Sequence, residues 1–292
     1  MPESKADPAH APAGVTDKPR IAWQPFTPGG VAAFADARFT RLFVLQLIVS
    51  VLGALAIVWL LWSAWFPAVR ESIRNLPAGG AIQEGQLAIP DVMEARLVTN
   101  RFLTFVVNLT DQRQNAVSAD LYFVLRRDHY EVCSLFGCSG WLYPLTNAPF
   151  TRLELEPKWA AWEPFLLGIT ALAVVFALIF SWWALATAYF VFARVFAFFK
   201  DRQVTLGGCW RICGAALLAG AVVLTAATVG YAFSVIDLVR LVIVAVLHVV
   251  VPWVLIAFAL RARPRIVPKA AANPFTAASP APNTSPNPFD EP

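Results

Sequence analysis

The residue of this chain whose type and position most favour chemistry is a histidine inside a long apolar run. His248 lies near the middle of Ala245-Val-Leu-His-Val-Val-Val-Pro252, in a stretch without charged residues. An ionisable side chain at that depth of a bilayer is costly, so it is a candidate for lining an ion or substrate path. The alternative is a neutral imidazole that helps the helices to pack, by bonding a neighbouring helix or a carbonyl that Pro252 leaves unpaired. No other charge-free run holds an acid or a base, which disfavours a proton relay.

Two further pairs of residues stand at helical spacing beside the apolar runs. Asp237 and Arg240 lie three positions apart just before the run that holds His248, on one face of a helix. They can form a local ion pair or cap the turn. The functional alternative is a ligand site at this end of the apolar run. Cys209 and Cys213 lie four positions apart at the start of another run. We expect them to pack in the bundle, with reversible lipidation as the alternative.

Cys133 and Cys138 enclose four residues in the more polar middle of the chain. In an oxidising compartment, two cysteines this close are expected to form a disulfide, which would make the loop rigid. Thiol exchange more typically uses two intervening residues than four. A metal site would need further ligands, and only His129 is near. We therefore expect a structural disulfide, and we expect no metal and no cofactor.

The chain carries none of the common catalytic signatures. It has no phosphate-binding glycine loop followed by Lys-Ser/Thr, no Gly-x-Ser-x-Gly, no His-Glu-x-x-His and no paired-cysteine zinc pattern. It also lacks a basic stripe interleaved with aromatic residues, which disfavours binding to nucleic acid. The prediction is a protein that is not an enzyme.

Four stretches free of Asp, Glu, Lys and Arg set the frame in which these residues lie. The stretches are residues 42–69, 164–193, 212–236 and 241–260. Each reaches the roughly 20 residues that a helix needs to cross the hydrocarbon core. Charged residues form 14% of the chain, against roughly 25% in soluble proteins. We predict an integral membrane protein with transmembrane helices at 42–66, 163–199, 208–233 and 238–261, the second long enough to tilt or to project from the bilayer.

The charges between the stretches predict the sidedness. Residues 1–41, 194–211 and 261–292 carry five, four and four basic residues against four, one and two acidic ones, a net +6. The segment 70–163 carries nine basic and eleven acidic residues, a net −2. Basic clusters beside span ends stay in the cytoplasm. We expect both termini in the cytoplasm of a bacterial cell, with the inner membrane as the location and the middle segment outside.

The segment 67–162 is predicted to fold as a small, mostly β extracytoplasmic domain between the first and second membrane helices. Its β-branched and aromatic runs, separated by turn-like residues, indicate three or four antiparallel strands. Residues 31–41 suit a short interfacial helix. The ends, 1–30 and 262–292, are rich in Pro and Ala and are predicted to be disordered in the cytoplasm.

Three short motifs of this segment carry a resemblance. They are Gly79-Gly-Ala-Ile-Gln-Glu-Gly-Gln-Leu87, Asn100-Arg-Phe-Leu-Thr-Phe-Val-Val-Asn108 and Ala119-Asp-Leu121. The pattern over residues 33–262 resembles a group of uncharacterised bacterial inner-membrane proteins, loosely likened to Yip-type membrane proteins. The resemblance implies one helix, an extracytoplasmic β domain and three further helices, and it brings no activity. Where that pattern has an acidic residue, this chain has Asn108, so a role tied to that acid does not carry over.

Two functions fit these observations. In the first, a non-enzymatic membrane protein acts as a scaffold or binding protein, and its outer domain engages a protein partner or an envelope component. In the second, the chain is a subunit of a transporter or channel complex, with His248, Asp237 and Arg240 along its path. Four spans without an internal repeat count against a transporter that works alone. The sequence leaves the oligomeric state open.

Overall fold

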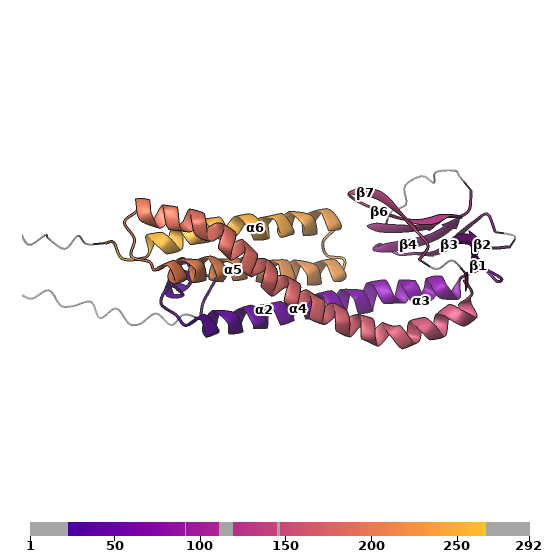
Figure 1. Cartoon of the computed structure of the whole chain (residues 1–292), viewed down its shortest axis with the longest axis horizontal. Helices are drawn as coiled ribbons and strands as arrows, with labels where there is room; N and C mark the ends of the chain where they lie inside the picture. Colours follow the sequence, from indigo (N-terminus) through magenta and orange to yellow (C-terminus); the bar gives the residue numbers. More distant parts are fainter. Residues whose placement is uncertain (1–22, 91, 111–118, 145–146, 267–292) are drawn as a thin grey trace, which may run out of the picture.

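The computed structural model describes residues 23–90, 92–110, 119–144 and 147–266. Its elements form a bundle of long helices and a β domain at one end of that bundle (Figure 1). Four helices are long and apolar enough to cross a membrane: Phe39–Arg74, Arg152–Phe199, Leu206–Ala232 and Leu238–Arg261. The β domain lies between the first and the second of them in the sequence. This order of one helix, β domain and three helices confirms the predicted architecture at that level.

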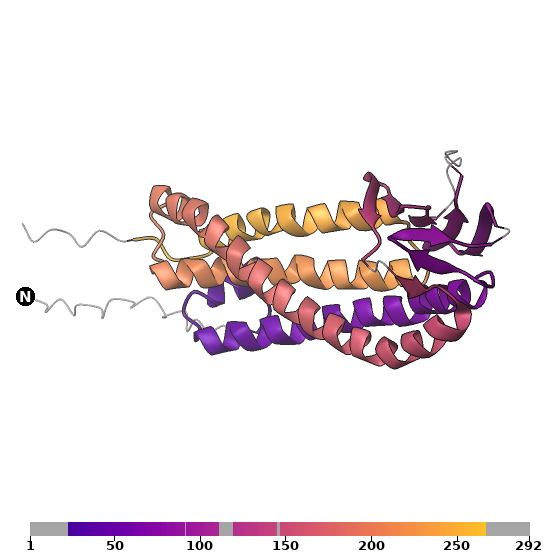
Figure 2. The ribbon, with the colours of Figure 1, turned by 45° about the vertical axis from the view of Figure 1, so that its right-hand side comes forward.

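The first long helix is built from three segments in continuous succession. These are α2 (Phe39–Leu60), a π-helical turn η1 (Leu61–Trp65) and α3 (Phe66–Arg74). The second, α4 (Arg152–Phe199), runs for 48 residues and begins eleven residues before the predicted start. Ion pairs join the two where both extend past the bundle: Arg70 to Glu163 at 3.4 Å and Arg74 to Glu156 at 3.0 Å. In Figure 2, α4 crosses α2 diagonally on its way to the other end of the bundle.

Helix α5 (Leu206–Ala232) forms the centre of the bundle and packs against α2, α4 and α6 (Leu238–Arg261). Small side chains let the neighbouring helices approach closely. Gly214 faces Leu42 and Gln46 of α2, and Gly220 faces His248 of α6. The outward faces are apolar instead of charged, as Phe180 (75% exposed) and Val246 (57%) illustrate. Such faces suit a hydrocarbon surrounding and would be unusual in water.

The end of the bundle away from the β domain holds both ends of the described chain (Figure 1). A short helix, α1 (Pro28–Ala33), begins earlier and ends sooner than the interfacial helix predicted at 31–41. This helix does not lie at the surface of the bundle as an interfacial helix would, because Val31 and Phe34 are fully buried among the long helices. Arg211 donates to the carbonyl oxygens of Phe34 and Ala35 at 3.1 and 2.5 Å and so fixes the turn that follows α1.

The β domain contains two sheets. The larger has the order β3-β4-β5-β6-β7, and the smaller has the order β2-β1-β8. Their strands are β1 (Ala81–Gln83), β2 (Gln86–Ala88), β3 (Glu94–Thr99), β4 (Leu103–Asn108), β5 (Leu121–Leu125), β6 (His129–Ser134), β7 (Gly137–Leu142) and β8 (Ala148–Pro149). The pairing of β4 with β5 is parallel, which corrects the prediction of an antiparallel sheet. Leu103 pairs with Leu121 and Val107 with Leu125, so both strands begin at the same end of the sheet.

One face of the larger sheet packs on the helices. Leu103, Phe105 and Phe123 of this face join a cluster with Ala64 and with Tyr231 at the end of α5. The rings of Phe105 and Phe123 stack with their centroids 4.7 Å apart. The sheet is therefore held against the bundle by apolar contacts, and its opposite face carries the polar groups described below.

The contact between α5 and α6 generates a first prediction. A Cβ added at Gly220 would lie 2.9 Å from Nδ1, 3.1 Å from the carbonyl oxygen and 3.2 Å from Cα of His248. Because two of these atoms are backbone, Gly220→Ala should force the helices apart and destabilise the protein by about 1–3 kcal/mol. Thermal unfolding of the detergent-purified protein measures the effect. Gly168→Ala in α4 is the matched control, since nothing lies within 4 Å of its Cβ position. Equal midpoints for both variants would contradict the packing described.

Candidate functional site

A cavity of about 780 Å³ lies on the polar face of the larger sheet and reaches the start of α6. This is within the usual range of small-molecule sites, roughly 300–1,000 Å³. The described residues that line it come from β4, β5, β6, β7, the neighbouring turns and the first turn of α6. They are Asn108, Ala119, Asp120, Tyr122, Val124, Arg126, Glu131, Cys133, Ser134, Leu135, Cys138, Asp237, Leu238 and Val239. We call this cavity the junction pocket.

Strand alternation places its side chains on one face. Successive residues of a strand point to opposite faces, and directly paired residues point to the same one. Tyr122 of β5 pairs with Cys133 of β6, and Val124 pairs with Glu131. These four therefore share the pocket face, while Tyr130, next to Glu131, points to the other face. There its ring lies 6.1 Å from that of Tyr143.

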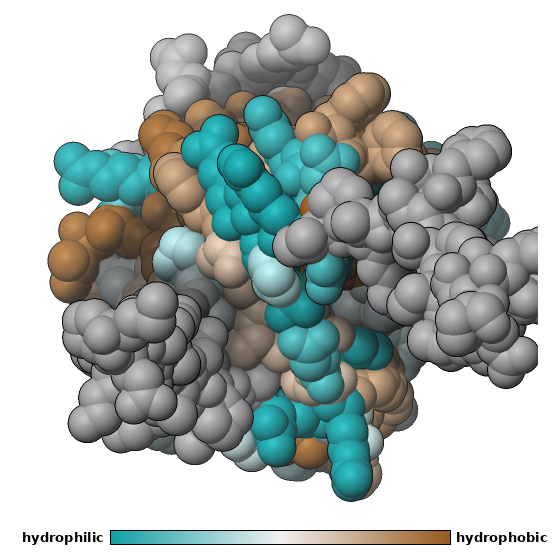
Figure 3. All heavy atoms as spheres, turned by 90° about the vertical axis from the view of Figure 1, so that its left-hand side faces the viewer, coloured by the Kyte–Doolittle hydropathy of each residue, from teal (hydrophilic) through white to brown (hydrophobic). Residues whose placement is uncertain are grey.

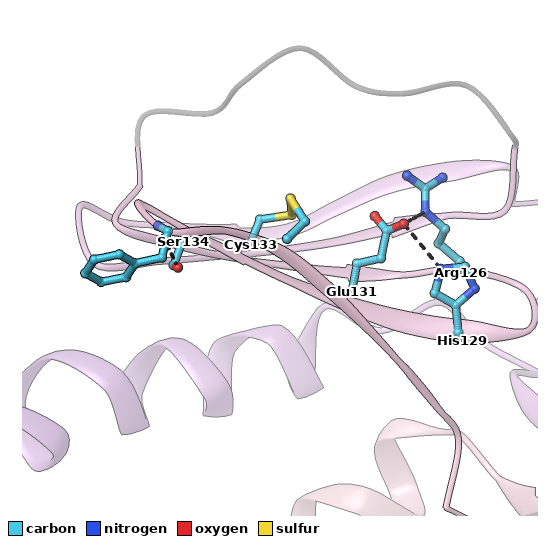
Figure 4. Close-up of a disulfide and its surroundings, with 7 residues drawn as sticks. Arg126, His129, Glu131, Cys133 and Ser134 are labelled. Atoms are coloured by element: carbon cyan, nitrogen blue, oxygen red, sulfur yellow. Dashed lines mark hydrogen bonds and ion pairs between the residues drawn. A yellow bond between two sulfur atoms is a disulfide. The ribbon is translucent and has the colours of Figure 1, made fainter.

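The predicted disulfide forms one wall of the junction pocket. Cys133 and Cys138 are directly paired across the β6–β7 hairpin, and their sulfur atoms are bonded at 2.04 Å. Figure 4 shows the disulfide on the same side of the sheet as Glu131 and Arg126. Only two residues, Leu135 and Phe136, connect the strands, and their side chains are 55% and 81% exposed. The covalent bond thus holds an apolar tip in a fixed place.

A charged cluster lies at the end of the pocket farther from the helices. Nε of Arg126 lies 2.9 Å from Oε1 of Glu131, and Nε2 of His129 lies 3.2 Å from the same oxygen. Nδ1 of His129 lies 2.7 Å from Asp128. The hydrogen bond to Asp128 raises the pKa of His129, against the effect of partial burial. Burial works to raise the pKa of Glu131, but the bonds from His129 and Arg126 lower it overall.

Three side chains connect the β domain to the turn between α5 and α6. Tyr231 donates from its hydroxyl to Oδ2 of Asp120 at 2.7 Å. Arg101 donates to the carbonyl oxygens of Ser234 and Ile236, both at 2.7 Å. These bonds align the sheet with the first turn of α6, so the two walls of the junction pocket are fixed relative to each other.

The polar residues singled out from the sequence separate into two places. Asp237 lines the junction pocket and caps α6, because its Oδ1 accepts from the backbone N–H of Arg240 at 2.8 Å. The exposed Arg240 side chain adds a 3.6 Å ion pair with Asp237. His248 lies eleven positions further on, about 16 Å along the helix, and packs against Gly220 with 9% of its surface exposed. The structure does not bring His248 together with Asp237 and Arg240.

The structure also locates the remaining residues that the sequence singled out. Cys209 and Cys213 are fully buried in the bundle, as expected for packing residues. Sequence reasoning did not single out Arg126, Glu131, Asp120 or Tyr231 as members of one site. Among the residues that the structure describes, no three or more His, Cys, Asp or Glu side chains are grouped to hold a metal ion.

Comparison with protein-family models, curated proteins and solved structures yields no significant match. The geometry of the site is therefore the basis for any functional proposal. The resemblance to bacterial inner-membrane proteins stays a prediction.

The charged cluster predicts a pH dependence of domain stability. In the unfolded chain His129 titrates near its ordinary pKa of about 6.5. Because folding raises this pKa, the stabilisation is complete below about pH 6.5 and is lost as pH rises through the folded value. His129→Gln should therefore destabilise β6 more at pH 5.5 than at pH 8.5. The difference should be below about 1 kcal/mol, because exposed ion pairs are weak.

Hydrogen exchange of β6 at the two pH values measures this difference. Asp128 and Glu131, whose pKa values are lowered, stabilise the fold at both pH values, and this contribution is lost only as pH falls far below this window. An effect of His129→Gln that is equal at both pH values, or larger at pH 8.5, would contradict the assigned bonds.

Proposed function

We propose that this chain is a non-enzymatic integral membrane protein that binds an envelope component in the junction pocket outside the membrane. The observation that carries the proposal is the lining of the pocket, to which both the β domain and the start of a membrane-length helix contribute side chains. Such a site presents its ligand at the membrane surface. The four long helices would anchor the site there and act as its scaffold.

The distribution of charge supports the orientation. At the end of the bundle away from the β domain, residues 23–41, 194–211 and 261–266 carry nine basic and two acidic residues. Figure 3 views this end, where hydrophilic residues cross the face between apolar flanks. Such an excess of Lys and Arg favours the cytoplasmic side of a membrane. The β domain would then lie outside the cytoplasm, where a disulfide such as Cys133–Cys138 persists.

The state of the polar groups favours binding over catalysis or transport. Glu131 is engaged by both Arg126 and His129, and Asp237 caps α6. These bonds hold the side chains in fixed orientations and stabilise the fold. A pocket with convergent polar groups of this kind is suited to binding a ligand. The transporter alternative depends on His248, which contacts Gly220 across a tightly packed seam between α5 and α6. No observation of this structure favours a path through the bundle, so the binding proposal stands alone.

In-cell photocrosslinking tests the proposal. A photoreactive amino acid in place of Tyr122, on the pocket face, should capture one reproducible envelope component. The same amino acid in place of Tyr130, on the opposite face of the same sheet, is the matched control and should capture at least fivefold less. The adduct at Tyr122 should also be lost in the Cys133→Ser, Cys138→Ser double variant, because the wall of the pocket is then released.

Mass spectrometry of the crosslinked protein identifies what is captured. Equal capture at Tyr122 and Tyr130, or capture at neither, would show that the junction pocket does not bind an envelope component in the cell.

A further inference from the structure

The lining of the junction pocket changes character along the strands. The end nearer the bundle is formed by Leu135, Leu238 and Val239. The far end is formed by Arg126 and Glu131, with Asn108 beside them at the end of β4. From Asp120 to Arg126 the chain advances six residues, roughly 20 Å at about 3.3 Å per residue. Asp120 and Asp237 also lie at the end nearer the bundle, where Tyr231 and the first turn of α6 engage their carboxylates. The apolar surface of Leu135, Leu238 and Val239 thus lies where the pocket meets the helices.

The end of the pocket nearer the bundle lies at the level where α5 ends and α6 begins. Figures 1 and 2 both show the β6–β7 hairpin reaching back to the domain end of α6. Val239, in the first turn of α6, is 51% exposed, and Leu135 at the hairpin tip is 55% exposed. Both residues belong to the lining of the pocket, one from the hairpin and one from α6, and we take this part of the lining as its mouth.

Exposed aromatic and apolar residues lie at this same level on other sides of the bundle. Trp59 contacts Trp62 and Phe233 with ring centroids 5.6 and 6.1 Å away. Trp62, Phe233 and Val235 are more than half exposed. Rings of this kind prefer the headgroup layer of a bilayer. A bilayer that surrounds the four helices would thus have its surface at the mouth of the pocket.

We infer that the ligand of the junction pocket is an acyl-chain lipid that enters sideways from the outer leaflet. This inference rests on the proposed function and names its ligand. The chains lie between the hairpin tip and the first turn of α6, and the head lies among Asn108, Tyr122, Arg126 and Glu131. Burial of each CH₂ group in the pocket offsets its removal from the bilayer, so the polar contacts of the head decide which lipid is selected.

The charges of the lining indicate the type of head. At the far end of the described lining the charged residues are one basic residue, Arg126, and one acidic residue, Glu131, whereas Asp120 and Asp237 lie at the bundle end. The positive charge is already paired with Glu131 at 2.9 Å. A head that carries an ammonium group beside its phosphate meets Glu131 with the one and Arg126 with the other, whereas a head with the phosphate alone brings no cationic partner for Glu131. The ligand class is therefore a zwitterionic, amine-bearing phospholipid.

The full chain in phosphatidylethanolamine vesicles that also contain phosphatidylglycerol tests this inference. In one arm the phosphatidylethanolamine carries a diazirine on its acyl chain close to the ester, and in the other arm the phosphatidylglycerol carries it. After irradiation, digestion and mass spectrometry, the first probe should label β5, which lies outside the bilayer. The second probe should label β5 at least tenfold less.

Two substitutions at the mouth distinguish a loss of lipid entry from a loss of folding. Val239→Asp should lower labelling of β5 at least tenfold, and Val235→Asp, at the same level but outside the pocket lining, should leave it unchanged. If Val239→Asp lowers the unfolding midpoint, Leu135→Asp with Phe136→Asp as its control replaces the pair. If labelling of β5 changes with neither Val239→Asp nor Leu135→Asp, entry of the lipid from the bilayer is overturned. Equal labelling by the two lipids would overturn the assignment of an amine-bearing head group.

The crosslinks at Tyr122 keep this inference distinct from the proposed function. Absent lipid labelling of β5, together with capture of a different envelope component at Tyr122, overturns the lipid ligand and leaves the binding proposal intact. Absence of both signals overturns the lipid and the proposed function together.

Discussion

The backbone carbonyls of the turn between α5 and α6 impose the constraint on which the rest of the arrangement depends. Carbonyl groups outside a helix or a strand have no regular backbone partner, and each must find a donor or water. Here the chain turns within five residues from α5 into α6, and Ser234 adopts a positive φ of 61° in that turn. Arg101 of the β domain donates to two carbonyls of the turn, at Ser234 and Ile236. The turn between two helices is thus completed by a side chain from another part of the fold.

That dependence joins the β domain and the bundle into one unit. The bond between Tyr231 and Asp120, together with the apolar cluster around Phe102 and Leu103, holds the sheet over the turn. The first turn of α6 then faces the sheet and closes the junction pocket. A looser domain would leave the two walls of the pocket free to separate. The proposed binding function therefore needs the connection as much as it needs the residues of the lining.

The features that local chemistry determines were predictable from the sequence. Charge-free runs predicted the four long helices, and a spacing of five residues predicted the Cys133–Cys138 bond. The early start of α4 has a local signal that was missed, since Arg152 and Glu156 form an i, i+4 ion pair. The parallel pairing of β4 with β5 and the bond between Asp120 and Tyr231, 111 residues apart, have no such signal. They depend on tertiary packing, so the site could not be assembled from spacing alone.

Hydrogen exchange of the turn between α5 and α6, with the protein in lipid nanodiscs, tests the central connection most directly. The amide of Val235 donates to Gly230 within the turn that Arg101 braces. This amide should exchange slowly in the unmodified chain and at least tenfold faster in Arg101→Ala. The control Arg96→Ala, an exposed arginine of the same domain, should not change it. Fast exchange in the unmodified chain, or exchange unaltered by Arg101→Ala, would show that the β domain does not brace the helices.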